Sequence, residues 1–175
     1  MSELPVDQLF DEAEIGARVE ALAAEIVAAI GRDLVVVGVL KGSFVFLADL
    51  VRALCRAGAL PRIEFMRLAS YGQGKESSGE VLLLGDAPRD FEGKAVLLVD
   101  DIVDTGLSMA YGRRLLLGRS ASAVWTCALL DKPSRRKVES PLDFVGFEIE
   151  DVFVVGYGID YAEQYRYLPY IGKVR

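Results

Sequence analysis

Apolar residues along the chain alternate between a helical period and the continuous runs that are typical of buried strands. Between residues 15 and 30 they recur at steps of three and four, which predicts an amphipathic helix. The β-branched run LVVVGVL at 34–40 predicts a strand that is buried on both faces. Residues 43–58 return to the helical period, with Ser43 as the expected N-cap and Gly58 as the expected C-cap.

The same pattern continues to the end of the chain, with a further helix expected at 107–118 between two strands. Strand–helix–strand units with continuous apolar strands predict a mostly parallel, twisted sheet that is flanked by helices. No internal repeat or linker interrupts the pattern, so we expect a single α/β domain over residues 1–175. The further strands are expected at 63–69, 81–86, 95–100, 123–130, 144–149 and 153–160.

Composition narrows the setting in which the protein works. The chain has 175 residues and is 52% hydrophobic, which is enough to bury a substantial core. It has no apolar run of the roughly 18 residues that a membrane span needs, and its acidic beginning does not resemble a secretory signal. Cys55 and Cys127 lie within apolar stretches, so we expect two reduced core thiols and a cytoplasmic protein.

Charge and the absence of one residue type exclude several function classes. The net charge of −6 argues against a general nucleic-acid-binding surface, and we interpret the short basic stretch at 132–137 as a solvated loop. The chain contains no histidine, which excludes Ser–His and Cys–His nucleophile pairs and histidine-rich zinc sites. Acid–base chemistry must therefore use carboxylates, lysine or tyrosine.

Three aspartates, Asp100, Asp101 and Asp104, follow an apolar strand and precede a Thr-Gly turn. Open parallel sheets bind ligands at the carboxyl ends of their strands. A glycine turn that opens a helix offers free backbone N–H groups and suits a phosphate, whereas carboxylates suit sugar hydroxyls or Mg²⁺. A simple helix-capping turn is the alternative, but three like charges repel and need a reason to converge.

The segment VLLVDDIVDTG resembles the phosphoribosyl-diphosphate (PRPP) binding motif of phosphoribosyltransferases. GVLKGSFVFLADL resembles the first active-site loop of the purine salvage branch, and SYG with the polar residues after it resembles that branch's mobile loop. LLDKPSRR and DFVGFEIEDVFVVGYGIDYAEQYRYLPYIG are similar to the base-binding end of bacterial hypoxanthine phosphoribosyltransferases. By this resemblance, which extends from about residue 34 to the C-terminus, the chain is identified as a member of the type I phosphoribosyltransferases.

The resemblance implies the type I phosphoribosyltransferase fold, with a small hood formed by the N- and C-terminal segments. It implies a Mg²⁺-dependent transfer of the phosphoribosyl group from PRPP to hypoxanthine or guanine, which gives IMP or GMP and diphosphate. Catalysis then consists of placing the base and stabilising the negative charge of the departing diphosphate. Family members are commonly homodimers or homotetramers, and we expect the same here, with no nucleic-acid or membrane partner.

The resemblance also assigns the PRPP ligands. Asp100 and Asp101 would hold the ribose hydroxyls and, together with Asp160, would supply metal ligands. Asp104 would lie beside the imidazole nitrogen of the purine as the general acid/base, a role that is typically worth about 10²–10⁴-fold. The loop at 40–42 would contact diphosphate and in this family can carry a non-proline cis peptide. The full set that would bind PRPP and its phosphates is Leu40, Lys41, Gly42, Asp100, Asp101, Asp104, Thr105, Gly106, Leu107, Ser108 and Arg166.

Base recognition is assigned to the C-terminal third of the chain. Lys132 would donate to the exocyclic oxygen of the purine, Phe153 would stack on the ring, and the backbone of Val154 would read its edge. From the residue types alone, a solvated surface charge is the favoured interpretation of Lys132, and ordinary core residues are as good an interpretation of Phe153 and Val154. The base-binding set is Lys132, Phe153, Val154 and Asp160, and Ser70 and Tyr71 begin the mobile loop at about 70–80 that would cover the reaction.

Two positions depart from the family pattern, and two other functions remain as alternatives. Asp100 stands where this branch usually has Glu, and Leu107 stands where many members have a polar or basic residue. The alternatives are a regulatory relative that keeps the PRPP site but binds RNA, and a phosphoribosyltransferase for another base such as xanthine. The acidic net charge counts against the first alternative.

Overall fold

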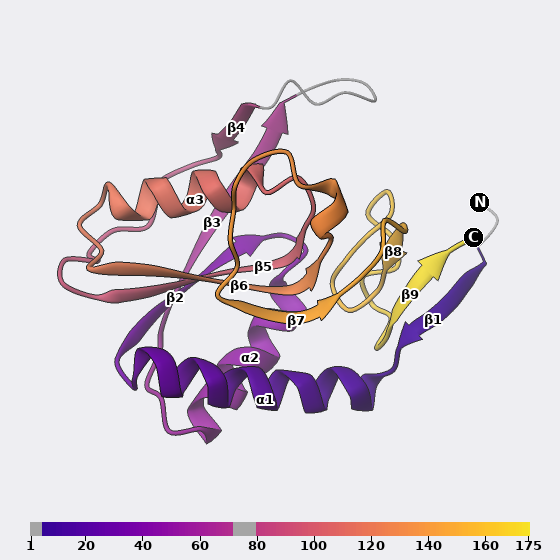
Figure 1. Cartoon of the computed structure of the whole chain (residues 1–175), viewed down its shortest axis with the longest axis horizontal. Helices are drawn as coiled ribbons and strands as arrows, with labels where there is room; N and C mark the ends of the chain where they lie inside the picture. Colours follow the sequence, from indigo (N-terminus) through magenta and orange to yellow (C-terminus); the bar gives the residue numbers. More distant parts are fainter. Residues whose placement is uncertain (1–4, 72–79) are drawn as a thin grey trace.

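The computed structural model describes residues 5–71 and 80–175 (Figure 1). Its centre is a six-stranded sheet in the order β4-β3-β2-β5-β6-β7. All neighbouring strands are parallel except β4, which pairs antiparallel with β3. The mostly parallel sheet that the apolar runs predict is therefore confirmed. Its strands are β2 (Leu34–Leu40), β3 (Arg62–Tyr71), β4 (Glu80–Leu83), β5 (Ala95–Val103), β6 (Ala123–Asp131) and β7 (Phe144–Glu148).

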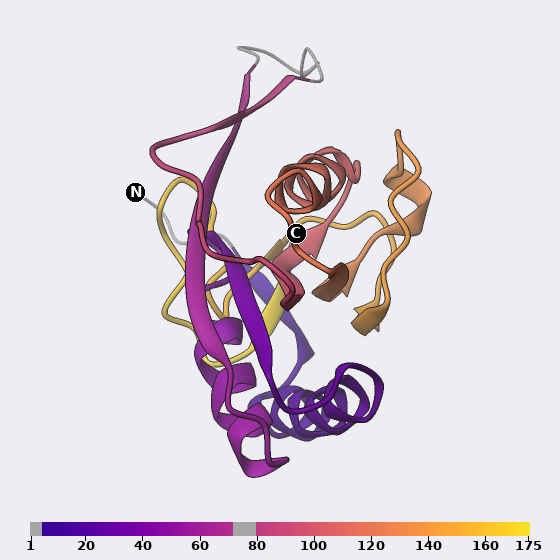
Figure 2. The same ribbon diagram turned by 90° about the vertical axis from the view of Figure 1, so that its left-hand side faces the viewer.

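Helices cover both faces of this sheet, with α1 and α2 on one face and α3 on the other (Figures 1 and 2). The central strand β5 shows why. Successive side chains of a strand point to opposite faces, and Leu97 belongs to the core under α1 and α2, whereas Leu98 belongs to the core under α3. A strand buried on both faces therefore has to be apolar throughout. The helices are α1 (Glu12–Ile30), α2 (Phe44–Arg56), α3 (Leu107–Leu117) and the short 3-10 helix η1 (Pro133–Arg135).

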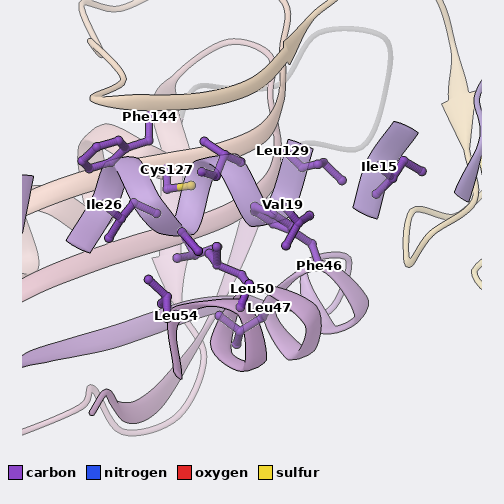
Figure 3. Packing of buried hydrophobic residues seen from close by; sticks show 14 of the residues in the cluster. Ile15, Val19, Ile26, Phe46, Leu47, Leu50, Leu54, Cys127, Leu129 and Phe144 are labelled. Carbon is purple, nitrogen blue, oxygen red and sulfur yellow. The ribbon is translucent and has the colours of Figure 1, made fainter. Parts of the chain in front are cut away.

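The larger core lies between the sheet and the α1–α2 pair, where helix side chains meet β6 and β7 (Figure 3). Each fully buried leucine, isoleucine or phenylalanine side chain in this core contributes about 1.5–3 kcal/mol to the stability of the folded protein. Cys127 is buried there as expected, and its burial raises the pKa of the thiol. The expectation for Cys55 is wrong, because this residue lies on the exposed side of α2; both thiols are free.

A small antiparallel sheet, separate from the central one, is built from both ends of the chain in the order β1-β9-β8. The hood of N- and C-terminal segments that the resemblance implies is thus present. The predicted strand at 153–160 is wrong beyond its first residues, because Gly156 and Gly158 have positive φ angles and turn the chain. The strands of the hood are β1 (Val6–Phe10), β8 (Val154–Val155) and β9 (Ile171–Val174).

The ends of α2 differ from the expected caps. Ser43 has helical dihedral angles and does not cap the helix through its side chain; its hydroxyl donates instead to the carbonyl of Val39 in β2. At the other end Ala57 is the C-cap, and Gly58 follows it with a φ of 95°. The glycine thus takes the left-handed conformation that commonly follows a helix.

The prediction of a loop at 70–80 is wrong for its first two residues. Ser70 and Tyr71 continue β3 and pair with Val81 and Glu80 of β4, so both predicted loop residues lie in a strand. The rest of that prediction, residues 72–79, falls outside the described residues. β4 itself ends at Leu83 rather than at residue 86. Among the described residues, no helix is long and apolar enough to cross a membrane.

Candidate active site

The paired acids Asp100 and Asp101 belong to β5, which continues beyond them to Val103. The strand was predicted to end at residue 100, but Val103 still pairs with Asp131 of β6. The alternation of a strand sends neighbouring side chains to opposite faces. Asp100 accordingly lines a cavity beside α3, on one face of the sheet. Asp101 lies on the other face, against Gly42, which precedes α2.

That cavity has a volume of about 240 Å³ and lies at the N-terminus of α3. Gly106, which precedes the helix, has a φ of 82°, and a β-carbon there would lie 2.9 Å from Cδ of Arg136. A backbone hydrogen bond from the loop after β6 supports this turn: the N–H of Lys137 donates to the carbonyl of Thr105 at 3.0 Å. Free N–H groups and the positive end of a helix dipole favour an anion such as a phosphate. The cavity is lined by Asp100, Ile102, Val103, Asp104, Thr105, Gly106, Leu107, Ser108 and Met109.

Three chain segments meet on the other side of β5. A β-carbon on Gly42 would lie 1.8 Å from Oδ2 of Asp101, so any larger residue here would force the Asp101 side chain or the loop to shift. A β-carbon on Gly158 would in turn lie 2.3 Å from the carbonyl oxygen of Gly42. The peptide bond between Leu40 and Lys41 is cis, in accord with the resemblance. Through the contacts of Gly42 and Gly158, the loop at 40–42 is packed between Asp101 and the turn after β8.

Burial changes the protonation of the paired acids. Desolvation, together with the charge of Asp101, raises the pKa of Asp100 well above its ordinary value. The pKa of Asp101 is also raised by desolvation, although hydrogen bonds and the charge of Arg166 oppose this effect. Two adjacent carboxyls in a low-dielectric site cannot ionise together as readily as they do in water.

The two cations predicted to face diphosphate are already paired with acids of the 158–166 turn. Nζ of Lys41 lies 2.7 Å from Oε1 of Glu163. Arg166 lies 2.8 Å from Oδ1 of Asp160 and 3.4 Å from Oε2 of Glu163. It also donates to the carbonyl of Gly158 at 2.7 Å. The structure therefore brings Lys41, Arg166 and Asp160 together, with Glu163 between the cations.

Two of the residues predicted to hold the base, Lys132 and Phe153, are not in the environments that a purely structural role would give them. Lys132 is only 7% exposed, so it is not a surface charge, and its Nζ lies 3.9 Å from Oδ1 of Asp151. Phe153 is 51% exposed, so it is not a core residue, and it packs edge-to-face on Tyr161. Val154 is buried at the start of β8 directly after it.

Sequence reasoning missed the ion pairs that surround Asp104. Nε of Arg135 lies 3.1 Å from Oδ1 of Asp104, and the same guanidinium lies 3.6 Å from Asp151. Arg136 donates to the carbonyl of Asp104 at 2.7 Å and pairs with Asp131. The interpretation of 132–137 as a solvated loop is confirmed for Arg135, which is exposed, but is wrong for Arg136, which is partly buried and paired with Asp131. The basic stretch was the available signal, but Asp104, the partner that both arginines share, is about 30 positions away.

The predicted metal ligands do not form a preformed cage. Within residues 5–71 and 80–175 no three acidic or cysteine side chains lie close enough to hold a metal ion. Mg²⁺ is commonly held by one or two carboxylates together with the phosphates of a substrate. That mode of binding needs no cage of three protein ligands, so the predicted ligands Asp100, Asp101 and Asp160 are compatible with it.

Comparison with protein families places the chain. A model of the phosphoribosyl transferase domain matches residues 5–162, which is most of the chain. The chain belongs to the phosphoribosyltransferase family. The match spans the loop at 40–42, the paired acids and the cavity at the N-terminus of α3, whereas Glu163 and Arg166 lie beyond its last residue.

Individual relatives are similar over nearly their whole length. A hypoxanthine phosphoribosyltransferase of Salmonella typhimurium is 47% identical over 173 residues, which cover 97% of this chain and 95% of the relative. A hypoxanthine-guanine phosphoribosyltransferase of Aquifex aeolicus is 49% identical over 168 residues, which cover 95% and 93%. A crystal structure of a Bacillus anthracis hypoxanthine-guanine phosphoribosyltransferase, with HEPES in its active site, has a TM-score of 0.91 at 42% identity and covers 99% of this chain and 100% of that one.

Proposed function

We propose that the protein is a purine salvage enzyme that transfers the phosphoribosyl group of PRPP to hypoxanthine or guanine and releases diphosphate. The observation that carries the proposal is the cavity at the N-terminus of α3, which two carboxylates, Asp100 and Asp104, also line. A phosphate-sized anion site next to two carboxylates suits a phosphorylated sugar, since the helix binds the phosphate and the acids bind hydroxyls.

The reaction exchanges two bonds at the anomeric carbon of the ribose. The bond from this carbon to a diphosphate oxygen breaks with its electron pair, and a bond to N9 of the purine forms as the base loses one proton. Asp104, at the mouth of the cavity, would exchange a proton with the imidazole edge of the purine. Lys132 would donate a hydrogen bond to the 6-oxo group and Phe153 would stack on the ring.

We further propose that the site takes Mg²⁺ together with PRPP, where the ion would supply positive charge that stabilises the departing diphosphate. Asp160 and the acid pair at 100–101 would hold the metal. Lys41 and Arg166 would bind the diphosphate oxygens directly, while the N–H groups of the 104–108 turn would hold the 5′-phosphate at the far side of the ribose.

The test is a turnover assay with PRPP, Mg²⁺ and each base in turn. We expect hypoxanthine and guanine to give nucleotide and diphosphate, and omission of Mg²⁺ to abolish turnover. Xanthine is the second candidate, because the buried Lys132 would serve any purine with a 6-oxo group. Absence of turnover with every oxopurine, in protein that is folded by circular dichroism, would refute the proposal.

We also propose that the enzyme works in the cytoplasm as a homodimer or homotetramer. Phe44 at the start of α2 and Phe65 on β3 are 47% and 50% exposed, and large exposed aromatics of this kind are common where subunits meet. Analytical ultracentrifugation at micromolar concentration tests this, and a monomer would contradict it.

A further inference from the structure

Glu163 contacts both cations of the proposed diphosphate site. Its Oε1 lies 2.7 Å from Nζ of Lys41, and its Oε2 lies 3.4 Å from Arg166. Lys41 stands at the end of β2 and Arg166 in the turn before β9, so the acid joins two segments that are far apart in the sequence. One carboxylate thus interacts with the positive charge that an incoming anion would need.

The backbone around Glu163 fixes this arrangement. The N–H of Glu163 donates to Oδ2 of Asp160 at 2.8 Å, and Tyr161 and Gln164 exchange backbone hydrogen bonds across the same turn. Glu163 has a φ of 64°, in the left-handed region that non-glycine residues adopt only with local support. The side chain therefore leaves from a defined turn and reaches Lys41 from a fixed point.

We propose that the Glu163 carboxylate occupies the place of an anionic ligand on Lys41 and Arg166, and that diphosphate, either free or as part of PRPP, displaces it on binding. The inference rests on the proposed function, which assigns diphosphate to these two cations. It adds a group that opposes binding above all at Lys41, since Asp160 lies closer to Arg166, at 2.8 Å, than Glu163 does.

Electrostatics supports competition rather than assistance. The hydrogen bond from Lys41 lowers the pKa of Glu163, so this carboxyl is ionised at neutral pH. A carboxylate and a diphosphate oxygen carry the same sign and cannot both lie against one ammonium group without repulsion. When the ligand leaves, the carboxylate returns to the cations, which lowers the cost of exposing them and speeds the release of diphosphate.

The test is isothermal titration of diphosphate, in the presence of Mg²⁺, into wild-type protein and the Glu163→Gln variant. Gln has the same shape but no charge, so the competitor is weakened and the turn is kept. Surface charge pairs are worth little in water, and we expect the variant to bind diphosphate about three- to tenfold more tightly. Because exposed charges are screened, the gain should shrink as ionic strength rises.

Glu20→Gln is the matched control. Glu20 on α1 forms a similar exposed ion pair, but with Arg56 at the far end of α2 from Lys41. This variant should bind diphosphate as the wild-type protein does. Unchanged or weaker binding by Glu163→Gln would overturn the inference, because weaker binding would mean that Glu163 holds Lys41 in position for the ligand.

A double-mutant cycle with Lys41→Gln separates the contacts further. In the Lys41→Gln background, Glu163→Gln should raise the affinity for diphosphate by a smaller factor than it does in the wild type. The reason is that Arg166 is then the remaining cation for which acid and ligand compete. An equal gain in both backgrounds would contradict the role of Lys41. If the wild-type protein binds neither diphosphate nor PRPP with Mg²⁺, the proposed function itself fails, which is a different outcome from normal wild-type binding with no effect of the variant.

Discussion

Nε of Arg135 lies 3.1 Å from Oδ1 of Asp104, and both side chains are partly exposed. An exposed pair of this kind contributes about 0–1 kcal/mol to stability. The pair serves mainly to orient Asp104, the proposed general acid/base, because it engages one carboxylate oxygen and leaves the other free for the purine. The same guanidinium reaches Asp151, which lies 3.9 Å from Lys132. One series of ion pairs therefore joins Asp104 and Lys132, two of the residues that would touch the purine.

Replacing Asp104 by Asn should lower kcat by about 10²–10⁴-fold, the usual contribution of a general acid/base. The amide keeps the size of the side chain but cannot accept the proton. Steady-state kinetics with hypoxanthine and PRPP tests this, with thermal unfolding measured to show that the fold is intact. A variant that retains a tenth or more of the wild-type kcat would exclude Asp104 from proton transfer.

Arg135→Gln should leave the unfolding midpoint almost unchanged but lower kcat more than it changes KM for the base. The variant leaves Asp104 in place but lets its carboxylate rotate. Arg135→Lys should recover part of the loss, since a charge remains near Asp104. The control is Arg113→Gln on the exposed side of α3, which should behave as the wild type does. Equal losses in the Gln and Lys variants would argue against a positioning role.

Gly42→Ala should raise KM for PRPP by more than about tenfold, because an added methyl group would lie 1.8 Å from a carboxylate oxygen of Asp101. The loop at 40–42 or the acid has to move, and both belong to the proposed PRPP site. Gly16→Ala is the control: nothing lies within 4 Å of a β-carbon there, and the helical position should gain about 0.5–1 kcal/mol. An unchanged KM in Gly42→Ala would show that this contact does not shape the site.

Asp100→Asn should stabilise the folded protein at neutral and alkaline pH. Burial raises the pKa of Asp100 in the folded protein above that of the unfolded chain. Its contribution to stability is therefore fully present at acid pH and is lost as pH rises through the folded-state pKa. Asn carries no charge at any pH, so the variant should unfold at a higher temperature at pH 8. We expect its free energy of unfolding there to exceed that of the wild type by about 1–2 kcal/mol.

The difference between Asp100→Asn and the wild type should disappear near pH 4, where an ordinary aspartate becomes protonated. The control is Asp33→Asn, since Asp33 is 78% exposed and pairs with Lys94 at the surface. Thermal unfolding at pH 4, 6 and 8 measures both variants. A gain for Asp100→Asn that is the same at all three pH values would contradict the assigned cause.

Local sequence was sufficient for the central sheet, because strands buried on both faces have to be continuous in apolar residues. The run at 34–40 became β2 with the same limits. The hood strands β1 and β9 escaped the pattern analysis, since each is short and partly exposed, and only their pairing with one another makes them strands. Ser43 does not cap α2 because its backbone is already helical and its side chain is directed to the carbonyl of Val39, an arrangement that depends on the preceding turn.

The site divides in the same way. Asp100, Asp101 and the 104–108 turn are contiguous, so their spacing already described a phosphate cavity beside two acids. The partners of the charged residues could not be predicted, because Lys41 and Glu163 are 122 positions apart and Arg135 and Asp104 are 31 apart. Such contacts follow from the packing of strands and turns, which the order of residues does not show.

The hood has a consequence for synthesis on the ribosome. β8, which carries the proposed edge reader Val154, pairs with β9, and β1 can pair only with β9. Translation proceeds from the N-terminus, so β1 leaves the exit tunnel long before its neighbour exists, whereas the central sheet can form as its strands emerge. The nascent protein should therefore acquire its phosphate cavity first and its purine-facing edge last, once residues 171–174 have been released.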